Sequence, residues 1–222
     1  MTKVKICGIT SLEDALAAAS AGADMLGFNF YKRSPRYIEP EAATTLCDAL
    51  RKELGANCPV LIGLFVNEVV GRISITMGKV GLKFVQLSGD ESGEMVRELR
   101  GTGFKAIRPR NKAEALDDAA YFLQYAPTSE AIPSLLLDAY HPDLYGGTGE
   151  QASIEVAQAV KEVVPRLMLA GGLKPENVGE IVRQVQPWGV DVASGVEVEG
   201  QPGKKDAAKM RDFVLAVRGA IS

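Results

Sequence analysis

The chain has 222 residues, of which 46% are hydrophobic, so it can bury the core of one large α/β domain. Its 25 basic and 28 acidic residues are mixed along the chain and leave a formal charge of −3, which provides no broad cationic surface for nucleic acid or an anionic membrane. Any anionic ligand must therefore be bound locally.

Short apolar, β-branched runs alternate with amphipathic stretches from one end of the chain to the other. The first unit is an expected strand at Val4–Ile9 followed by an expected helix at Leu12–Ala21, which Thr10 or Ser11 can cap. The further strands are expected at Met25–Phe30, Val60–Val66, Phe84–Leu87, Phe104–Ile107, Leu135–Leu137, Leu167–Ala170 and Val190–Ala193. The helices after them are expected at Pro40–Glu53, Glu68–Lys79, Gly93–Arg100, Ala113–Tyr125, Ala152–Val163, Pro175–Gln186 and Lys205–Val217.

This alternation predicts the fold class. Most of the expected strands are too continuously apolar for a sheet with one wet face, so they suit parallel strands covered by helices. Strand-helix units of about 25 to 30 residues match a (β/α)8 TIM barrel that forms a single domain over residues 1–222. A doubly wound open sheet is the alternative. In both folds, ligands and catalytic groups gather at the carboxyl ends of the strands.

The cysteines and the single histidine exclude several classes of site. Cys7, Cys47 and Cys58 are odd in number and lack CxxC spacing, which argues against a disulfide framework and a structural zinc site. With His141 as its only histidine, the chain cannot form a multi-histidine metal centre. The start of the chain lacks an apolar signal-peptide core, and no stretch is long enough to span a membrane. We therefore expect a soluble, cytoplasmic protein.

Glycines follow the last two expected strands. Gly171 and Gly172 come after the seventh strand, and Ser194 and Gly195 come after the eighth. Glycine lets backbone N–H groups approach a phosphate, and barrels often bind phosphate at these two loops. Each turn alone could be a tight turn that needs positive φ. The pair at matched positions favours a phosphate site.

Candidate catalytic groups end two other strands. Cys7 closes the first strand, where its thiol would face a substrate and the next helix could favour its thiolate, although a buried inert cysteine is the usual case. Asp138 follows three leucines in the sixth strand, so partial desolvation could raise its pKa and keep the proton that acid catalysis needs. A loop or capping carboxylate is the alternative for Asp138. Cys47 and Cys58 suit packing and a turn.

Three loop features complete the candidate site. Arg36, restricted by its neighbours in the loop after the second strand, can bind a carboxylate through two parallel hydrogen bonds. Gly147 and Gly149 lie in a glycine-rich segment that could be a lid or an anion-binding turn. A hydrolase pair of Cys7 and His141 has no third orienting group, which disfavours it.

With these residues described, nearly the whole chain resembles the phosphoribosylanthranilate isomerase family. The motifs are specific in combination: Val4-Lys5-Ile6-Cys7-Gly8-Ile9-Thr10, Gly27-Phe28-Asn29-Phe30-Tyr31, Ser34-Pro35-Arg36-Tyr37, Gly63-Leu64-Phe65-Val66-Asn67, Leu136-Leu137-Asp138, Gly146-Gly147-Thr148-Gly149 and Asp191-Val192-Ala193-Ser194-Gly195-Val196-Glu197.

The resemblance implies a cofactor-free Amadori rearrangement of a small phosphoribosyl substrate in tryptophan biosynthesis, by a monomer or homodimer. It implies that Cys7 is the base, Asp138 the acid and Arg36 the ligand of the anthranilate carboxylate. The backbone around Gly171, Gly172, Ser194 and Gly195 would then hold the phosphate. The substrate supplies its own electron sink, so the expected chemistry requires neither a metal nor an organic cofactor.

The chain departs from the family pattern at two places. Ser88 stands where histidine is frequent, and Glu150-Gln151-Ala152-Ser153 replaces a Phe-Asp-Trp-like segment. The main alternative is another phosphosugar barrel isomerase, of the histidine-pathway type or bifunctional, which would usually carry an acid in place of Cys7. A non-catalytic phosphosugar-binding barrel is the alternative outside enzymes. It would need neither Cys7 nor Asp138.

Overall fold

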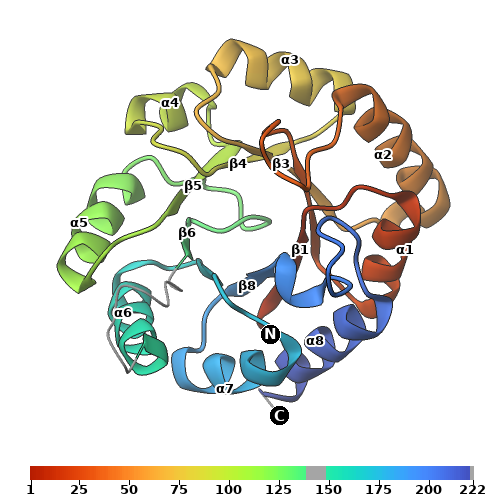
Figure 1. Cartoon of the computed structure of the whole chain (residues 1–222). Helices are drawn as coiled ribbons and strands as arrows, with labels where there is room; N and C mark the ends of the chain where they lie inside the picture. The colour runs from red at the N-terminus through yellow and green to blue at the C-terminus, as the bar shows by residue number, and fades with distance from the viewer. Residues whose placement is uncertain (139–148, 221–222) are drawn as a thin grey trace.

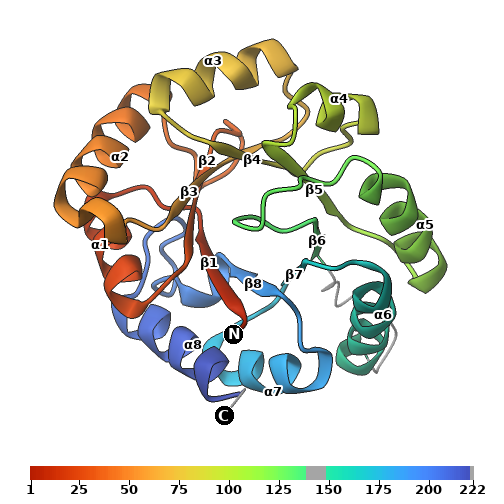
Figure 2. The ribbon, with the colours of Figure 1, turned by 180° about the vertical axis from the view of Figure 1, so that it is seen from behind.

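Eight parallel strands form a closed barrel in the computed structural model, which describes residues 1–138 and 149–220, with the backbone alone for 149–153. The strands follow chain order around the ring, and Figures 1 and 2 show from opposite sides that the helices surround them. The strands are β1 Lys3–Cys7, β2 Met25–Asn29, β3 Val60–Phe65, β4 Phe84–Leu87, β5 Gly103–Ile107, β6 Leu135–Asp138, β7 Leu167–Ala170 and β8 Gly189–Val192. The helices are α1 Leu12–Ala21, α2 Pro40–Leu54, α3 Val70–Val80, α4 Gly93–Glu98, α5 Lys112–Leu123, α6 Gly149–Val163, α7 Pro175–Val185 and α8 Ala207–Gly219.

The pairing of β1 with β8 closes the sheet and confirms the predicted TIM barrel. Lys5 lies beside Asp191 in this pairing, and on the other edge of β1 Cys7 lies beside Gly27 of β2. An open doubly wound sheet would leave two edges unpaired, so the alternative fold is excluded. All the described elements belong to this one barrel. That the domain extends over residues 1–222 stays a prediction.

Alternation along the strands divides the core into two layers. Successive side chains of a strand point to opposite faces, and on β1 Val4 and Ile6 belong to the large apolar cluster between strands and helices. The barrel interior holds a second apolar cluster, which includes Met25, Ile62 and Met168. Lys5 and Cys7 occupy the inward positions of β1. Their side chains therefore share the interior with that second cluster.

One predicted helix cap is confirmed, and one helix start differs from its prediction because of a tertiary contact. Ser11 caps α1 by accepting a hydrogen bond from the backbone N–H of Asp14, as one of the two predicted caps. Helix α8, predicted from Lys205, begins at Ala207 because Lys205 pairs with Glu197 and Asp206 provides the cap. Short 3-10 helices at Gly55–Asn57 (η1) and Ser194–Val196 (η2) were not predicted.

Asp24 joins the start of β1 to the last helix. Its carboxylate accepts hydrogen bonds from Lys3 Nζ at 2.9 Å, the Val4 N–H at 2.8 Å and Arg218 Nη2 at 2.8 Å. Burial alone would raise the pKa of Asp24, but these three donors outweigh it and lower the pKa. This cluster holds the first strand of the barrel in place.

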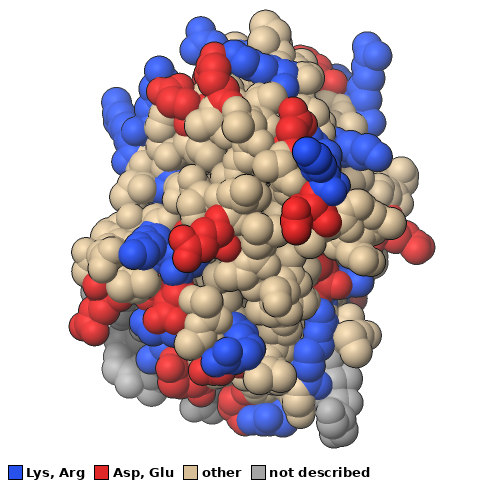
Figure 3. All heavy atoms as spheres, turned by 90° about the vertical axis from the view of Figure 1, so that its right-hand side faces the viewer, with Lys and Arg blue, Asp and Glu red and all other residues tan. Residues whose placement is uncertain are grey.

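The surface shows no large area of one charge on the face that Figure 3 presents, where lysine and arginine alternate with aspartate and glutamate. The described helices are too short or too polar to cross a bilayer. Trp188 is half buried and packs against the interior cluster.

Candidate active site

A cavity of about 540 Å³ opens at the carboxyl ends of the strands. Side chains from all eight strands line it, and so do residues of the loops after β2, β5, β7 and β8. Cys7, Arg36 and Asp138 line this cavity together with Gly171, Gly172 and Ser194. A second cavity of about 580 Å³ lies around Trp188 and lacks this set of chemical groups. The chemistry therefore selects the smaller cavity.

Cys7 ends β1 at the floor of the cavity and is 5% exposed. Burial raises the pKa of its thiol, and the nearby Lys5 ammonium only partly offsets this. The sequence suggested the opposite direction, a thiolate favoured by the next helix. Four residues, 8–11, separate Cys7 from α1, and burial is the largest effect on the thiol.

Asp138 ends β6, so the glycine loops after β7 and β8 lie between it and Cys7 around the ring. The three preceding leucines are buried, whereas the Asp138 side chain is 29% exposed. Its Oδ2 accepts a hydrogen bond from Nε of Arg108 at 3.2 Å. Arg108, on the loop after β5, lines the same cavity and was not singled out from the sequence.

Arg36 reaches the cavity through a hydrogen-bonded loop. Its N–H donates to Ser34 Oγ, which also accepts from the Asn29 side chain. The guanidinium donates from Nε and Nη2 to the two carboxylate oxygens of Glu197, at 2.7 and 2.8 Å. The edge formed by its two Nη nitrogens still has donors for a ligand carboxylate. Lys32 and Arg33 of the same loop are exposed, as expected for solvated charges.

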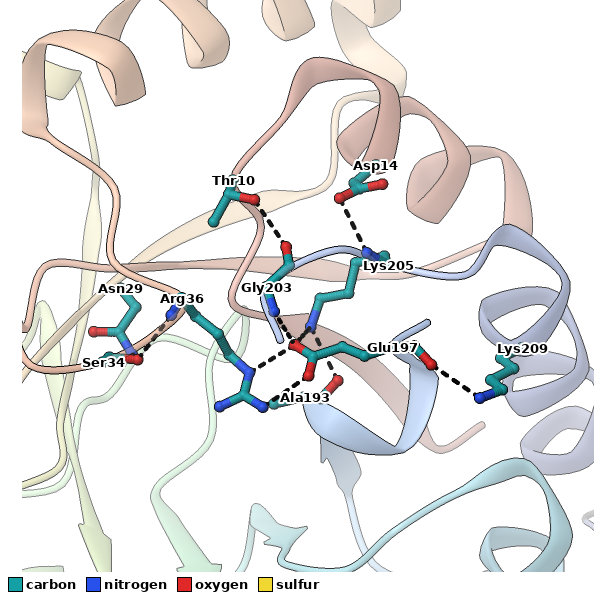
Figure 4. A network of polar contacts seen from close by, with 10 residues as sticks. All are labelled: Thr10, Asp14, Asn29, Ser34, Arg36, Ala193, Glu197, Gly203, Lys205 and Lys209. Carbon is teal, nitrogen blue, oxygen red and sulfur yellow. Dashed lines mark hydrogen bonds and ion pairs between the residues drawn. The ribbon is translucent and has the colours of Figure 1, made fainter. Parts of the chain in front are cut away.

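Glu197 is the centre of a buried polar network, drawn in Figure 4. It accepts from Arg36, from the Gly203 N–H at 3.1 Å and from Lys205 Nζ at 3.1 Å. Burial would raise the pKa of Glu197, but Arg36 and Lys205 outweigh it and lower the pKa. Lys205 also donates to the Ala193 carbonyl at 2.9 Å. The network thus connects the Arg36 loop with the loop after β8.

The two glycine loops approach each other at the cavity wall. Gly171 and Gly172 have φ of 91° and 60°, a region that glycine adopts without strain. A Cβ on Gly195 would lie 1.9 Å from the Leu173 carbonyl oxygen, so only glycine lets the β8 loop pack on the β7 loop. Ser194 is exposed toward the cavity. Backbone N–H groups in such loops can surround a phosphate.

The wall at β4 contains one orphaned polar atom. Gln86 donates from Nε2 to Ser88 Oγ at 3.0 Å, and both side chains are buried and line the cavity. Over the described residues, Gln86 Oε1 is the buried side-chain polar atom that no donor reaches. Such an atom can accept a hydrogen bond from a ligand. Ser88 is its neighbour.

Part of the predicted site lies outside the described residues. Gly147 and His141 belong to the segment 139–148, and Gly149 is the first residue of α6. Their predicted roles therefore stay predictions. In the rest of the chain, no three histidine, cysteine, aspartate or glutamate side chains group in a way that could hold a metal ion.

Comparison with known proteins identifies the family. The sequence model that describes N-(5'phosphoribosyl)anthranilate (PRA) isomerase matches residues 4–216. A relative from Trichlorobacter lovleyi, named N-(5'-phosphoribosyl)anthranilate isomerase, is 44% identical over 221 residues, which cover 100% of both chains. The chain belongs to the N-(5'-phosphoribosyl)anthranilate isomerase family.

Two solved structures of the isomerase family support this assignment. Phosphoribosyl anthranilate isomerase from Thermotoga maritima has a TM-score of 0.83 and 36% identity, with 99% of this chain and 100% of that chain covered. Another phosphoribosyl anthranilate isomerase, in complex with reduced 1-(O-carboxyphenylamino)-1-deoxyribulose 5-phosphate, has a TM-score of 0.81 and 34% identity, with 99% and 100% covered. The resemblance noted from sequence motifs is therefore confirmed.

In this member of the isomerase family, sequence reasoning missed four charged residues around the cavity: Lys5, Arg108, Glu197 and Lys205. Two of them could have been noticed. Lys5 is a charged residue at an inward position of an otherwise apolar strand, and Glu197 stands within a quoted motif. Their partners lie far along the chain, with Glu197 and Arg36 separated by 161 positions. Only the closed barrel brings them together.

Proposed function

We propose that Cys7 and Asp138 are the base and the acid with which this N-(5'-phosphoribosyl)anthranilate isomerase converts its substrate to 1-(2-carboxyphenylamino)-1-deoxyribulose 5-phosphate. The observation that carries the proposal is that both side chains line one cavity from β1 and β6, the strands on either side of the glycine loops of β7 and β8. A phosphate held by those loops lies between acid and base around the ring.

The reaction needs one proton donor and one proton acceptor. Asp138 protonates the furanose ring oxygen, and the C1′–oxygen bond breaks to give a protonated Schiff base of the anthranilate nitrogen. The positive nitrogen acidifies the hydrogen on C2′. The Cys7 thiolate removes that proton, and the electron pair of the C–H bond forms the enolamine while the nitrogen becomes neutral. Tautomerisation to the ketone completes the rearrangement.

Two anionic ends of the substrate hold the reacting carbon in place. The outer edge of Arg36 binds the anthranilate carboxylate, while Glu197 holds the inner edge and so fixes the guanidinium plane. The backbone of Gly171, Gly172 and Ser194, which line the cavity, and of Gly195, which packs against the β7 loop, binds the phosphate. Binding at both ends holds the reacting carbon near the acid and the base, which raises the rate of the proton transfers.

Turnover of phosphoribosylanthranilate, followed by the loss of its fluorescence, tests the assignment of base and acid. Cys7→Ser and Asp138→Asn should each reduce kcat by at least about 10²-fold, the usual contribution of a positioned proton-transfer group. Cys58→Ser is the matched cysteine control, because Cys58 precedes the start of β3, does not line the cavity and is half buried. It should retain wild-type turnover. Full turnover by both catalytic variants would overturn the mechanism.

The other phosphosugar isomerase considered from the sequence is disfavoured by the family match and by Cys7 itself, which stands where an acid is usual in that enzyme. The three cysteines are free thiols, which supports a reducing compartment, and we propose a cytoplasmic enzyme. Whether it is a monomer or a homodimer stays a prediction for sedimentation or light scattering to decide.

A further inference from the structure

The interior of the barrel contains a lysine that the proposed chemistry does not use. Lys5 is 0% exposed and is among the largest of the fully buried side chains in the described part of the chain. Burying an ammonium costs free energy even when it is paired, and an apolar residue of similar volume would fill the same space without that cost. The fold alone therefore does not explain a lysine at this position.

Strand geometry places this ammonium directly below Cys7. Lys5 and Cys7 are two residues apart on β1, so both side chains point inward, with Cys7 nearer the cavity. Lys5 Nζ donates to Asp191 Oδ1 at 2.9 Å, across the pairing of β1 with β8. A Cβ built on Gly27 would lie 2.8 Å from Cys7 Sγ and 3.1 Å from Lys5 Nζ, so both atoms border the same small space.

The charges that face Cys7 come from four segments of the described chain. They are Lys5 on β1, Asp191 on β8, Arg36 on the loop after β2 and Lys205 ahead of α8. The β2 residue paired with Cys7 is Gly27, which has no side chain, and β2 carries no charged residue. Arg36 and Lys205 both bind the carboxylate of Glu197, whereas Lys5 binds Asp191 below the thiol. These three cations face two carboxylates. Thiolate formation therefore places a negative charge where cations are in excess.

The electrostatics assign opposite effects to the two members of that pair. Burial raises the pKa of Cys7, Lys5 lowers it and Asp191 raises it. For Lys5, burial would lower the pKa, but Asp191 and Cys7 outweigh burial and raise it. Asp191 and the Cys7 thiolate therefore both favour the ammonium form of Lys5.

We propose that Lys5 is a positioning residue of the isomerisation, whose buried ammonium, held by Asp191, stabilises the Cys7 thiolate that accepts the substrate proton. The inference rests on the proposed role of Cys7 as base. Lys5 exchanges neither a proton nor a covalent bond with the substrate. The proton removed from C2′ ends on sulfur, and the ammonium offsets the sulfur charge only while the thiolate exists.

Titration of the thiolate tests this role without turnover. The ultraviolet absorbance of the thiolate is followed against pH for each protein and for the same protein carrying Cys7→Ser, so that the difference reports Cys7 alone. Lys5→Met should raise the pKa of Cys7 and leave about tenfold less thiolate at a pH below it. Asp191→Asn should shift the titration in the opposite direction. General damage to the barrel would not produce opposite shifts.

Lys105→Met is the matched control. Lys105 is also a buried barrel lysine, 5% exposed and paired with buried Glu91 at 3.2 Å, but it faces a space around β4 and β5 whose lining does not include Cys7. Its loss should lower the melting temperature and leave the Cys7 titration unchanged. If Lys5→Met does not fold, Lys5→Met with Asp191→Asn removes both charges and should still raise the pKa of Cys7.

The acidic limb of the kcat/KM profile should move in the same direction as the thiolate titration in each variant. An unchanged Cys7 titration in the Lys5 variants, or equal shifts in Lys5→Met and Lys105→Met, would overturn the inference. Turnover that survives Cys7→Ser would instead overturn the base assignment, whatever the titration shows. The two failures are therefore distinguishable.

Discussion

Gly27 leaves no room for a side chain beside the proposed base, so Gly27→Ala is a sharp test of how closely Cys7 must be placed. The added Cβ would lie 2.8 Å from Cys7 Sγ and 3.2 Å from Cys7 Cα. Favourable contacts between such atoms lie at about 3.5 to 4.0 Å, so the sulfur must retreat by about 1 Å. The backbone of Gly27 does not have positive φ, so the perturbation is steric.

A displacement of that size sets the expected loss. Misplacing a reacting group by about 1 Å costs on the order of 10²-fold in rate, or about 2.7 kcal/mol of activation free energy. Overpacking of the interior should also lower the free energy of unfolding by about 1 to 3 kcal/mol. The KM should change less than kcat, because the proposed phosphate loops follow β7 and β8 and Arg36 lies beyond the end of β2, in the next loop.

Steady-state fluorescence kinetics and urea unfolding measure these two effects on the same preparation. Gly78→Ala is the control, because nothing lies within 4 Å of a Cβ at this position of α3, and alanine should stabilise the helix by about 0.5 to 1 kcal/mol. A folded Gly27→Ala protein with wild-type kcat would refute the reasoning that Cys7 Sγ acts from the position described.

Three further predictions concern Glu197 beside Arg36, the packing of the two glycine loops, and Asp24 at the start of β1. Glu197→Gln should raise the KM about tenfold by weakening the hold on Arg36, and steady-state kinetics with unchanged KM would contradict it. Gly195→Ala forces the β8 loop away from the Leu173 carbonyl and should weaken binding of inorganic phosphate about tenfold or more by calorimetry. Asp24→Asn should lower the free energy of unfolding by about 1 to 3 kcal/mol at neutral pH. Because the folded pKa of Asp24 is lowered, its contribution is present above the unfolded value near about 3.9 and is lost as the pH falls through the folded pKa, so melting curves of the two proteins should converge in acid.

Local pattern was enough to predict most elements of the barrel. The predicted β4 and β7 coincide with the observed Phe84–Leu87 and Leu167–Ala170, because short apolar runs between turns are typical of buried strands. One boundary was wrong because a side chain has a distant partner. Lys205 reads as the start of α8, yet its ammonium is bound by Glu197 and it lies outside the helix.

The candidate site was predictable as far as the strand-end rule extends. Cys7 and Asp138 end strands and Arg36 lies in the loop after one, and the structure brings all three to one cavity. The pKa direction of Cys7 was not predictable, because it depends on how deeply the thiol is buried and on which charges surround it.

The order of strands and helices, the family and the strand-end groups follow from the chain alone, because each depends on neighbours within a few residues. The pairing of Lys5 with Asp191 does not, since 186 positions separate the two residues. Closure of β1 on β8 decides that pairing, and with it which charges face the thiol. The burial of the thiol and the charges around it exist only in the assembled barrel, so only the tertiary structure determines the direction in which the pKa of Cys7 shifts.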